Sequence, residues 1–212
     1  MQFVILIPIL FFSIVLHEFA HGYAAYRMGD QTAYYAGRLT LNPLAHVDWV
    51  GTIILPALCF LLGFPLFGWA KPVPINPARL PSPRKDMGKV ALAGPAVNLL
   101  LALIAVIGLK LAFVFGAHLG ERALLTCVFG LQYAVLINVL LAVFNLIPIP
   151  PLDGGRIAVA LLPLDSALAY DRFFSRFGMW LVLFLILSGG IRYVLLPTSQ
   201  FVYGILLKIV GL

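Results

Sequence analysis

The first apolar run of the chain carries charged and titratable side chains at a depth where a membrane helix rarely tolerates them. Residues 3–26 are long enough to cross a bilayer as a helix, which takes about 20 residues. The motif HEFAH at 17–21 interrupts this run, and ionisable groups at that depth are costly unless they are paired or bound. Residues four apart share a helix face, so His17 and His21 can reach one metal ion, and Glu18 can act on a metal-bound water. The motif predicts a metal site; the alternative is a chance match with buried, hydrogen-bonded histidines.

The composition places the whole chain in a membrane. Of the 212 residues, 62% are hydrophobic and 10% are charged, whereas a soluble domain has about half apolar and a quarter charged residues. The apolar runs fit helices and not barrel strands, and the chain has room for about five to six spans. The net charge of +6 comes from basic residues that flank apolar runs, so the partner it indicates is the lipid bilayer and not nucleic acid. The sequence therefore predicts an all-α polytopic membrane protein.

Several segments have distinct expected roles within one membrane-embedded domain, residues 1–212, with its core at 2–163 and additional C-terminal membrane segments at 164–212. Residues 50–63 are short for a span and contain a proline, which suits a re-entrant segment or half-helix. Residues 34–41 have weak strand character and predict a small interfacial β element, and the Pro-rich residues 64–85 predict an interfacial loop. The first run lacks a cationic start and a cleavage site, so we expect a retained span. The expected membrane helices are 2–27, 87–116, 123–147, 177–190 and 193–212.

The distribution of Lys and Arg predicts the orientation. If 50–63 does not cross, the basic segments 27–89 and 156–176 lie on one side, which the positive-inside rule assigns to the cytoplasm. We therefore expect a multi-pass protein of the cell membrane whose active site opens to the cytoplasm. His17 lies ten residues before Arg27, about 15 Å from the helix end. Asp153 precedes Asp165 by twelve residues, so it reaches a similar depth if the chain continues as a helix.

A third metal ligand is expected among only eight acidic residues. Asp153 is the one flanked by apolar segments on both sides. Prolines at 148, 150 and 151 stop the preceding helix, and Gly154 and Gly155 let the backbone turn sharply. The alternative is an ordinary turn at the membrane surface with a solvated aspartate. His46 and Asp48 form a second candidate for ligation or gating, although local hydrogen bonds in a loop are the simpler reading. Cys59 and Cys127 are interpreted as small buried hydrophobes.

Two motifs together resemble a known family. HEFAH and NLIPIPPLDGGR (145–156) resemble the site-2 protease family of intramembrane zinc metalloproteases. AGRLTLNPLAHVD, FGWAKPVPIN and AGPAVN resemble its compact bacterial branch, which has no PDZ or CBS domain. The resemblance runs from about residue 10 to about residue 160. It implies that His17, His21 and Asp153 bind zinc and that Glu18 is the general base.

The same resemblance implies roles for two amides and a reaction. Asn145 is expected to bind substrate backbone or the oxyanion, and Asn98 is expected to contact substrate or support the site. The implied enzyme is a zinc-dependent intramembrane metalloendopeptidase with one Zn²⁺ per chain. It would use a zinc-bound water activated by Glu18 to hydrolyse peptide bonds within or near transmembrane segments of membrane proteins. The substrate helix would unwind and pair with 31–41 or 70–76.

Two other functions are compatible with the residues. A transporter or channel also places acids and histidines inside a membrane, but it predicts paired broken helices, and the sequence has one such break. A catalytically silent, zinc-binding scaffold would typically lack Glu18 or a ligand, and none is missing. The oligomeric state stays open.

Overall fold

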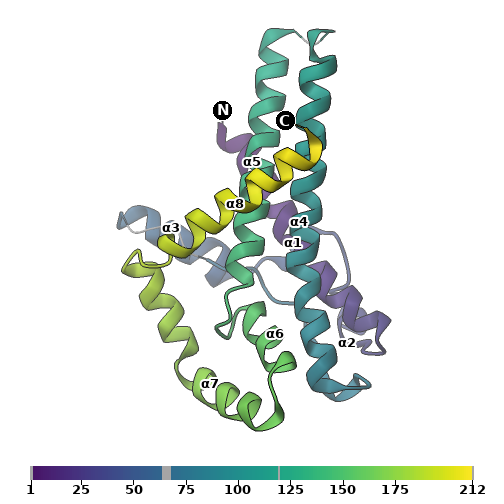
Figure 1. The fold of residues 1–212 in the computed structure, drawn as a ribbon, viewed down its shortest axis with the longest axis vertical. Helices are drawn as coiled ribbons and strands as arrows, with labels where there is room; N and C mark the ends of the chain where they lie inside the picture. Colours follow the sequence, from purple (N-terminus) through teal and green to yellow (C-terminus); the bar gives the residue numbers. More distant parts are fainter. Residues whose placement is uncertain (1, 64–67, 119, 212) are drawn as a thin grey trace.

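The computed structural model describes residues 2–63, 68–118 and 120–211 and is built from helices (Figure 1). No strand occurs among these residues. The all-α class is therefore confirmed. The long helices are α1 (Gln2–Arg27), α4 (Pro83–Phe115), α5 (Glu121–Asn145), α7 (Leu164–Leu187) and α8 (Arg192–Val210). The short elements are α2 (Thr32–Tyr35), η1 (Pro43–His46), η2 (Trp49–Ile54), α3 (Leu55–Leu61), η3 (Pro77–Arg79), η4 (Gly116–His118) and α6 (Asp153–Leu161).

Four of the described helices are long and apolar enough to span a bilayer, which is fewer than the predicted five to six. They are α1 from Val4 onward, α4, α5 and α8. The α7 helix is long enough but carries Asp171, Arg172 and Arg176, which leaves only 177–187 free of charge. The η2 and α3 elements together cover residues 49–61, about 20 Å of helix and too short to cross. They fit the predicted half-helix.

The long helices α4 and α5 form an antiparallel pair that sets the length of the molecule, and α8 crosses this pair obliquely (Figure 1). The core between these three helices is aliphatic. Small residues on α4, such as Ala102 and Ala105, face branched residues on α5, and Leu206 of α8 closes the cluster. The helix α1 packs against both α4 and α5. The helix α4 therefore contacts every element that carries a predicted ligand, because α6 also packs against it.

Large apolar side chains remain exposed along the spanning helices, as expected for surfaces that face lipid. On α4 these include Leu92, Leu100, Ile104, Ile107 and Leu111. A water-soluble protein rarely leaves such contiguous apolar surface uncovered. Membrane embedding therefore follows from the structure as well as from the composition.

The predicted interfacial β element is wrong. Tyr34 and Tyr35 lie in the one-turn helix α2, and the residues up to Leu41 form turns and bends. The reason is Asp30, whose Oδ1 accepts hydrogen bonds from the backbone N–H and the hydroxyl of Thr32. This contact fixes the first residue of a helical turn, so local side-chain bonding outweighs the strand preference of the tyrosines.

The break between α5 and α6 occurs where the prolines predict it. The helix α5 ends at Asn145, and α6 begins at Asp153. The role of the two glycines differs from the prediction, because neither has a positive φ. A Cβ on Gly154 would strike the carbonyl oxygen of Leu146, and a Cβ on Gly155 would strike Pro150. The glycines are therefore required for close packing of α6 against the preceding turn.

Candidate metal centre

The HEFAH motif lies in the second half of α1 and places both histidines on one face of the helix. His17 and His21 are one helical turn apart. Their Nε2 atoms lie 3.0 Å from each other, and both residues are buried. The structure thus brings the two imidazoles together as predicted.

Asp153 joins the pair from a distant part of the chain. It is the first residue of α6, and its Oδ2 lies 3.2 Å from Nε2 of His17 and 3.3 Å from Nε2 of His21. The aspartate side chain is only 15% exposed, and Oδ2 is buried without a hydrogen-bond partner. A solvated aspartate in a surface turn does not fit this placement.

The second ring nitrogens determine where the protons of the neutral histidines lie. Nδ1 of His21 lies 2.8 Å from the carbonyl oxygen of Val90, which can only accept. Nδ1 of His17 lies 2.5 Å from Oδ1 of Asn98, which is also an acceptor. Each neutral ring therefore carries its proton on Nδ1 and a lone pair on Nε2. Two imidazole lone pairs and a carboxylate oxygen then face one another, an arrangement that is repulsive unless a cation lies between them.

The spacing of these three atoms fits zinc. Bonds of about 2.0–2.2 Å at tetrahedral angles put ligand atoms about 3.3–3.5 Å apart, close to the observed 3.0, 3.2 and 3.3 Å. Within the described ranges, His17, His21 and Asp153 are the one group of three potential metal ligands. Three protein ligands leave a fourth position for water or substrate, which is typical of catalytic zinc sites.

A glycine on α4 lets this helix lie directly against the histidines. A Cβ at Gly94 would come within 2.5 Å of Nε2 of His21 and 2.6 Å of Nε2 of His17. No other residue type leaves that space empty. Small residues such as those of the AGPAVN segment allow close helix contact, and at Gly94 the contact is with the candidate metal centre itself.

The three donor groups open into a small cavity of about 200 Å³, and Glu18 lines it beside them. Oε2 of Glu18 accepts a hydrogen bond of 3.0 Å from the backbone N–H of Val73. A segment 55 residues away thus lies over the predicted general base. Met87, Val90, Ala91, Pro151 and Arg156 are among the other lining residues.

The 69–76 segment that carries Val73 is anchored along its length by hydrogen bonds. Val73 contacts Glu18 on α1, but the other hydrogen bonds of this segment come from residues outside the elements that carry metal ligands. The helix α1 is therefore not its only support. Trp69 N–H donates to Gly51 O, Lys71 N–H donates to His46 O, Arg38 donates to Lys71 O, and Asn76 N–H donates to Oδ2 of Asp30.

The two predicted asparagines lie on different sides of the histidines. Asn145, the last residue of α5, lines the cavity, and its Nδ2 donates to the carbonyl of Leu141. Asn98 is fully buried and lies beneath His17. It is not among the residues that line the cavity, so a supporting role suits it better than the predicted contact with substrate.

His46 and Asp48 do not reach the metal centre. His46 is fully buried, and its Nε2 lies 2.9 Å from the carbonyl oxygen of Thr40. Asp48 accepts hydrogen bonds from the N–H groups of Val50 and Gly51 at the start of η2. Both residues hold the loop together, which was the simpler reading of the sequence.

Sequence reasoning missed Ser13, Val73 and Asn138. Ser13 lies four residues before His17, so a polar face at 13, 17 and 21 was a readable signal on α1. Asn138 is a polar residue inside the apolar run of α5, which is also a signal. Val73 contributes its backbone N–H, and no sequence pattern marks that contact.

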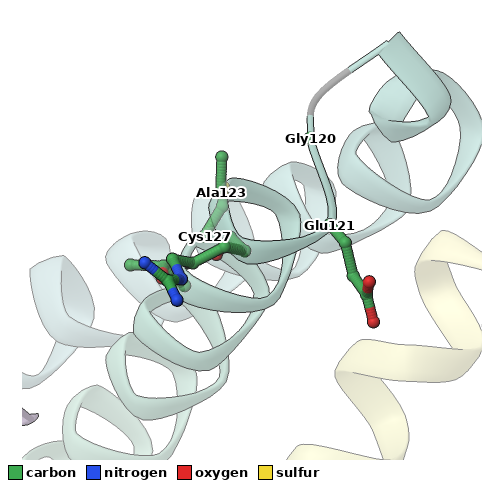
Figure 2. A pocket seen from close by; sticks show the side chains of 6 residues that line it. Gly120, Glu121, Ala123 and Cys127 are labelled. Atoms are coloured by element: carbon green, nitrogen blue, oxygen red, sulfur yellow. Dashed lines mark hydrogen bonds between the residues drawn. The ribbon is translucent and has the colours of Figure 1, made fainter.

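A hollow at the opposite end of α5 from Asn145 has no such donor set. Figure 2 shows its lining, with Glu121 pointing away from the helix. Glu121 and Cys127 are both exposed, so the interpretation of Cys127 as a buried side chain is wrong, and neither residue belongs to the group of potential metal ligands. Among the described residues, the potential metal ligands thus lie near the Asn145 end of α5 and not at this hollow.

Comparison with known proteins shows the family to which the chain is related. The model of peptidase family M50 matches residues 5–128 and 114–188. YwhC of Bacillus subtilis, named as a proposed zinc metalloprotease, is 39% identical over 198 residues, which cover 91% of this chain and 84% of YwhC. No solved structure matches the chain at a significant level.

Two further relatives are longer than the region they share with this chain. Rip2 of Mycolicibacterium smegmatis, also named as a proposed zinc metalloprotease, is 38% identical over 72% of this chain and 55% of its own length. The zinc metalloprotease MJ0392 of Methanocaldococcus jannaschii is 26% identical over 94% of this chain and 47% of its own length.

Proposed function

The chain belongs to peptidase family M50, and we propose that it is an intramembrane endopeptidase that cuts membrane proteins within or near their transmembrane segments. The family and its relatives support a membrane-embedded zinc metalloprotease. The observation that carries the finer proposal is the position of the donor group. His17 lies 13 residues from one end of the Val4–Arg27 span and 10 from the other, so about 15–20 Å of helix lies on either side.

Each residue of the centre has a distinct role in this proposal. His17, His21 and Asp153 would hold one zinc ion, which when bound supplies a Lewis acid that polarises the scissile carbonyl and acidifies a water molecule. Glu18 accepts the proton of the attacking water and later delivers it to the leaving amine. The hydrogen bond from Val73 holds the Glu18 carboxylate at the cavity.

Asn145 is the proposed donor to the oxyanion. Its side chain lines the cavity, and one proton of its Nδ2 is used on Leu141 O. An amide nitrogen carries two protons, so the second can be donated to the negative charge that develops on the substrate oxygen. Such a contact stabilises the transition state more than the ground state.

A second cavity provides the path for water. It has a volume of about 450 Å³ and shares Met87, Pro151 and Arg156 with the cavity at the metal centre. Arg84 and Asp171 also line it, which places charged groups along this path. The bias of Lys and Arg towards 27–89 and 156–176 assigns this side to the cytoplasm. Water therefore reaches the site from the cytoplasm in this proposal.

The substrate must present extended backbone to the centre. A helix keeps its carbonyls in internal hydrogen bonds, so a transmembrane helix has to unwind locally before attack. Val73 and Ile75 of the 69–76 segment line the cavity, which lets the unwound chain lie alongside this segment. The other predicted partner, 31–41, is partly helical and has no residue in the lining of the cavity.

The decisive experiment compares the full chain with Glu18→Gln in proteoliposomes that contain a labelled single-span membrane protein. We expect cleavage to fall by about 10²–10⁴-fold, while bound zinc is unchanged because Glu18 is not a ligand. Glu121→Gln is the matched control, since it removes the same charge at an exposed position and is expected to cleave normally. Cleavage by Glu18→Gln at the wild-type rate would falsify the proposal.

The same variants separate the competing functions. A transporter would move ions without needing Glu18, and a silent scaffold would bind zinc but cleave nothing in either form. In cells, membrane proteomics of Glu18→Gln is expected to reveal short membrane stubs that accumulate. Removal of zinc by a chelator should stop cleavage, and added zinc should restore it.

A further inference from the structure

We propose that Ser13 and Asn138 act, through Asn98, as positioning residues that fix the proton of His17 on Nδ1 and so present Nε2 as a lone pair to zinc. These three residues are here named the hydrogen-bond relay. The inference rests on the proposed zinc site but concerns residues that contact neither substrate nor metal.

The relay joins three helices by an unbroken series of hydrogen bonds. Ser13 on α1 donates from Oγ to the carbonyl of Ile9 over 2.8 Å, and its Oγ accepts from Nδ2 of Asn138 over 2.9 Å. Oδ1 of Asn138 on α5 accepts from Nδ2 of Asn98 over 2.8 Å. Oδ1 of Asn98 on α4 lies 2.5 Å from Nδ1 of His17. The series therefore starts at a backbone carbonyl and ends at a proposed metal ligand.

All members of the relay are buried among apolar helices. Asn98 is 0% exposed, and Ser13 and Asn138 are each 2% exposed. Polar side chains at such positions are unfavourable unless their hydrogen bonds are made. Amides can join membrane helices by hydrogen bonds, but this series ends on Nδ1 of a proposed metal ligand, which points to a role at the metal centre.

The direction of each hydrogen bond follows from the first one. The carbonyl of Ile9 can only accept, so the single proton of Ser13 is used there and its Oγ must act as an acceptor for Asn138. The second proton of Asn138 Nδ2 goes to the carbonyl of Ala134, over 2.9 Å. Both amide protons of Asn138 then face acceptors, which leaves its Oδ1 to face Asn98.

The same reasoning fixes Asn98 and then His17. The Nδ2 of Asn98 must donate to Asn138, so its Oδ1 must face the imidazole. An oxygen there can only accept, and the proton of His17 is therefore held on Nδ1. This leaves the Nε2 lone pair directed at the point where His21 and Asp153 converge.

Different groups hold the two histidines in the same tautomer. His21 is held by the backbone carbonyl of Val90, which cannot reverse its polarity. His17 is held by an amide, and an amide can rotate by 180° to present N–H in place of oxygen. A rotated Asn98 would favour the proton of His17 on Nε2 and block the metal. The relay prevents this rotation, which explains why it is required at His17 alone.

The first test measures zinc affinity of the metal-free full chain in detergent by competition with a chromogenic chelator. Asn138→Leu keeps the size of the side chain but removes both hydrogen-bonding faces, and we expect zinc binding to weaken about 10–100-fold. Ser13→Ala leaves Nδ2 of Asn138 with Ala134 O as its one remaining acceptor, and we expect a loss of zinc affinity of about twofold to tenfold. Ser13→Thr retains the hydroxyl and is expected to restore the affinity. Thr126→Val removes a hydroxyl from α5 at an exposed position and is the matched control.

The second test reads the proton directly by ¹⁵N resonances of the four histidines. In the wild type, we expect His17 to be protonated at Nδ1. In Asn138→Leu and Ser13→Ala, we expect a new population protonated at Nε2, which a loss of packing alone would not produce. If Asn138→Leu does not fold, the comparison of Ser13→Ala with Ser13→Thr decides the question.

The outcomes separate this inference from the proposed function. Wild-type affinity together with an unchanged His17 proton in Asn138→Leu or Ser13→Ala would overturn the relay and leave the zinc site intact. A wild-type chain that binds no zinc would instead overturn the proposed function.

Discussion

Replacing Gly94 by alanine adds one methyl group directly against the metal centre. The new Cβ would lie 2.5 Å from Nε2 of His21 and 2.6 Å from Nε2 of His17. Real Cβ contacts essentially never fall below 3.0 Å, so the helix or the histidines must separate by at least about 0.5 Å. Metal–ligand distances tolerate only about ±0.2 Å. To the extent that the histidines take up this shift, they leave the geometry that zinc prefers, and zinc binding weakens.

The expected effect is specific to the metal. Overpacking of this kind costs about 1–3 kcal/mol, which corresponds to a zinc dissociation constant raised by about fivefold to 150-fold. Alanine is also a better helix former than glycine by about 1 kcal/mol, so the unfolding temperature of metal-free protein should change little. Zinc affinity is measured by chelator competition, and thermal unfolding is followed by circular dichroism.

Gly108→Ala on the same helix is the matched control. Its new Cβ would approach Cδ2 of Leu131 at 3.0 Å, and that side chain can move. We expect Gly108→Ala to bind zinc as the wild type does. If Gly94→Ala also kept wild-type affinity, the close approach of α4 to the histidines would have no bearing on metal binding, and the reasoning would be wrong.

Three further substitutions probe other parts of the fold. Asp153→Asn keeps the shape of the side chain but removes its charge, and we expect the zinc content measured by mass spectrometry to fall at least tenfold. At Asp30, burial raises the pKa of the carboxyl, but the hydrogen bonds from Thr32 and Asn76 and the charge of Arg79 bring the pKa below its ordinary value of 3.8. The stability due to Asp30 is therefore complete above pH 3.8 and is lost as the pH falls below it, so Asp30→Asn should lower Tm by about 2–4 °C at pH 7 and weaken the acid sensitivity. Arg84 donates to Val159 O and Leu162 O at the end of α6, and Arg84→Met should speed hydrogen exchange there by about tenfold.

The sequence allowed the helices near the site to be predicted because strong local signals bound them. The first helix was predicted at 2–27 and extends from Gln2 to Arg27, where a charged residue and a turn follow an apolar run. The prolines after Asn145 ended α5 as expected. Five to six spans were predicted and four described helices qualify by length and composition, because the charge at Arg176 lies in the middle of a continuous helix, where the sequence suggested the edge of one.

Most contacts between distant segments could not be predicted from the sequence. The distance between Asn98 and Asn138 depends on how α4 and α5 are rotated about their axes, which side-chain packing across the whole bundle decides. The bond from Val73 to Glu18 depends on a backbone amide, so residue identity gives no hint of it. The grouping of His17, His21 and Asp153 could be predicted because metal chemistry restricts which side chains suit it.

The proposed metal ligands lie far apart in the sequence, so they become available at different times while the chain is synthesised. His21 and Asp153 are separated by 132 residues, which a ribosome takes roughly 7–26 s to translate at about 5–20 residues per second. During that interval the nascent chain already contains both histidines and Glu18, but it lacks the third proposed donor. Under the proposed function, the centre is therefore incomplete until α6 has been made and has docked against α4.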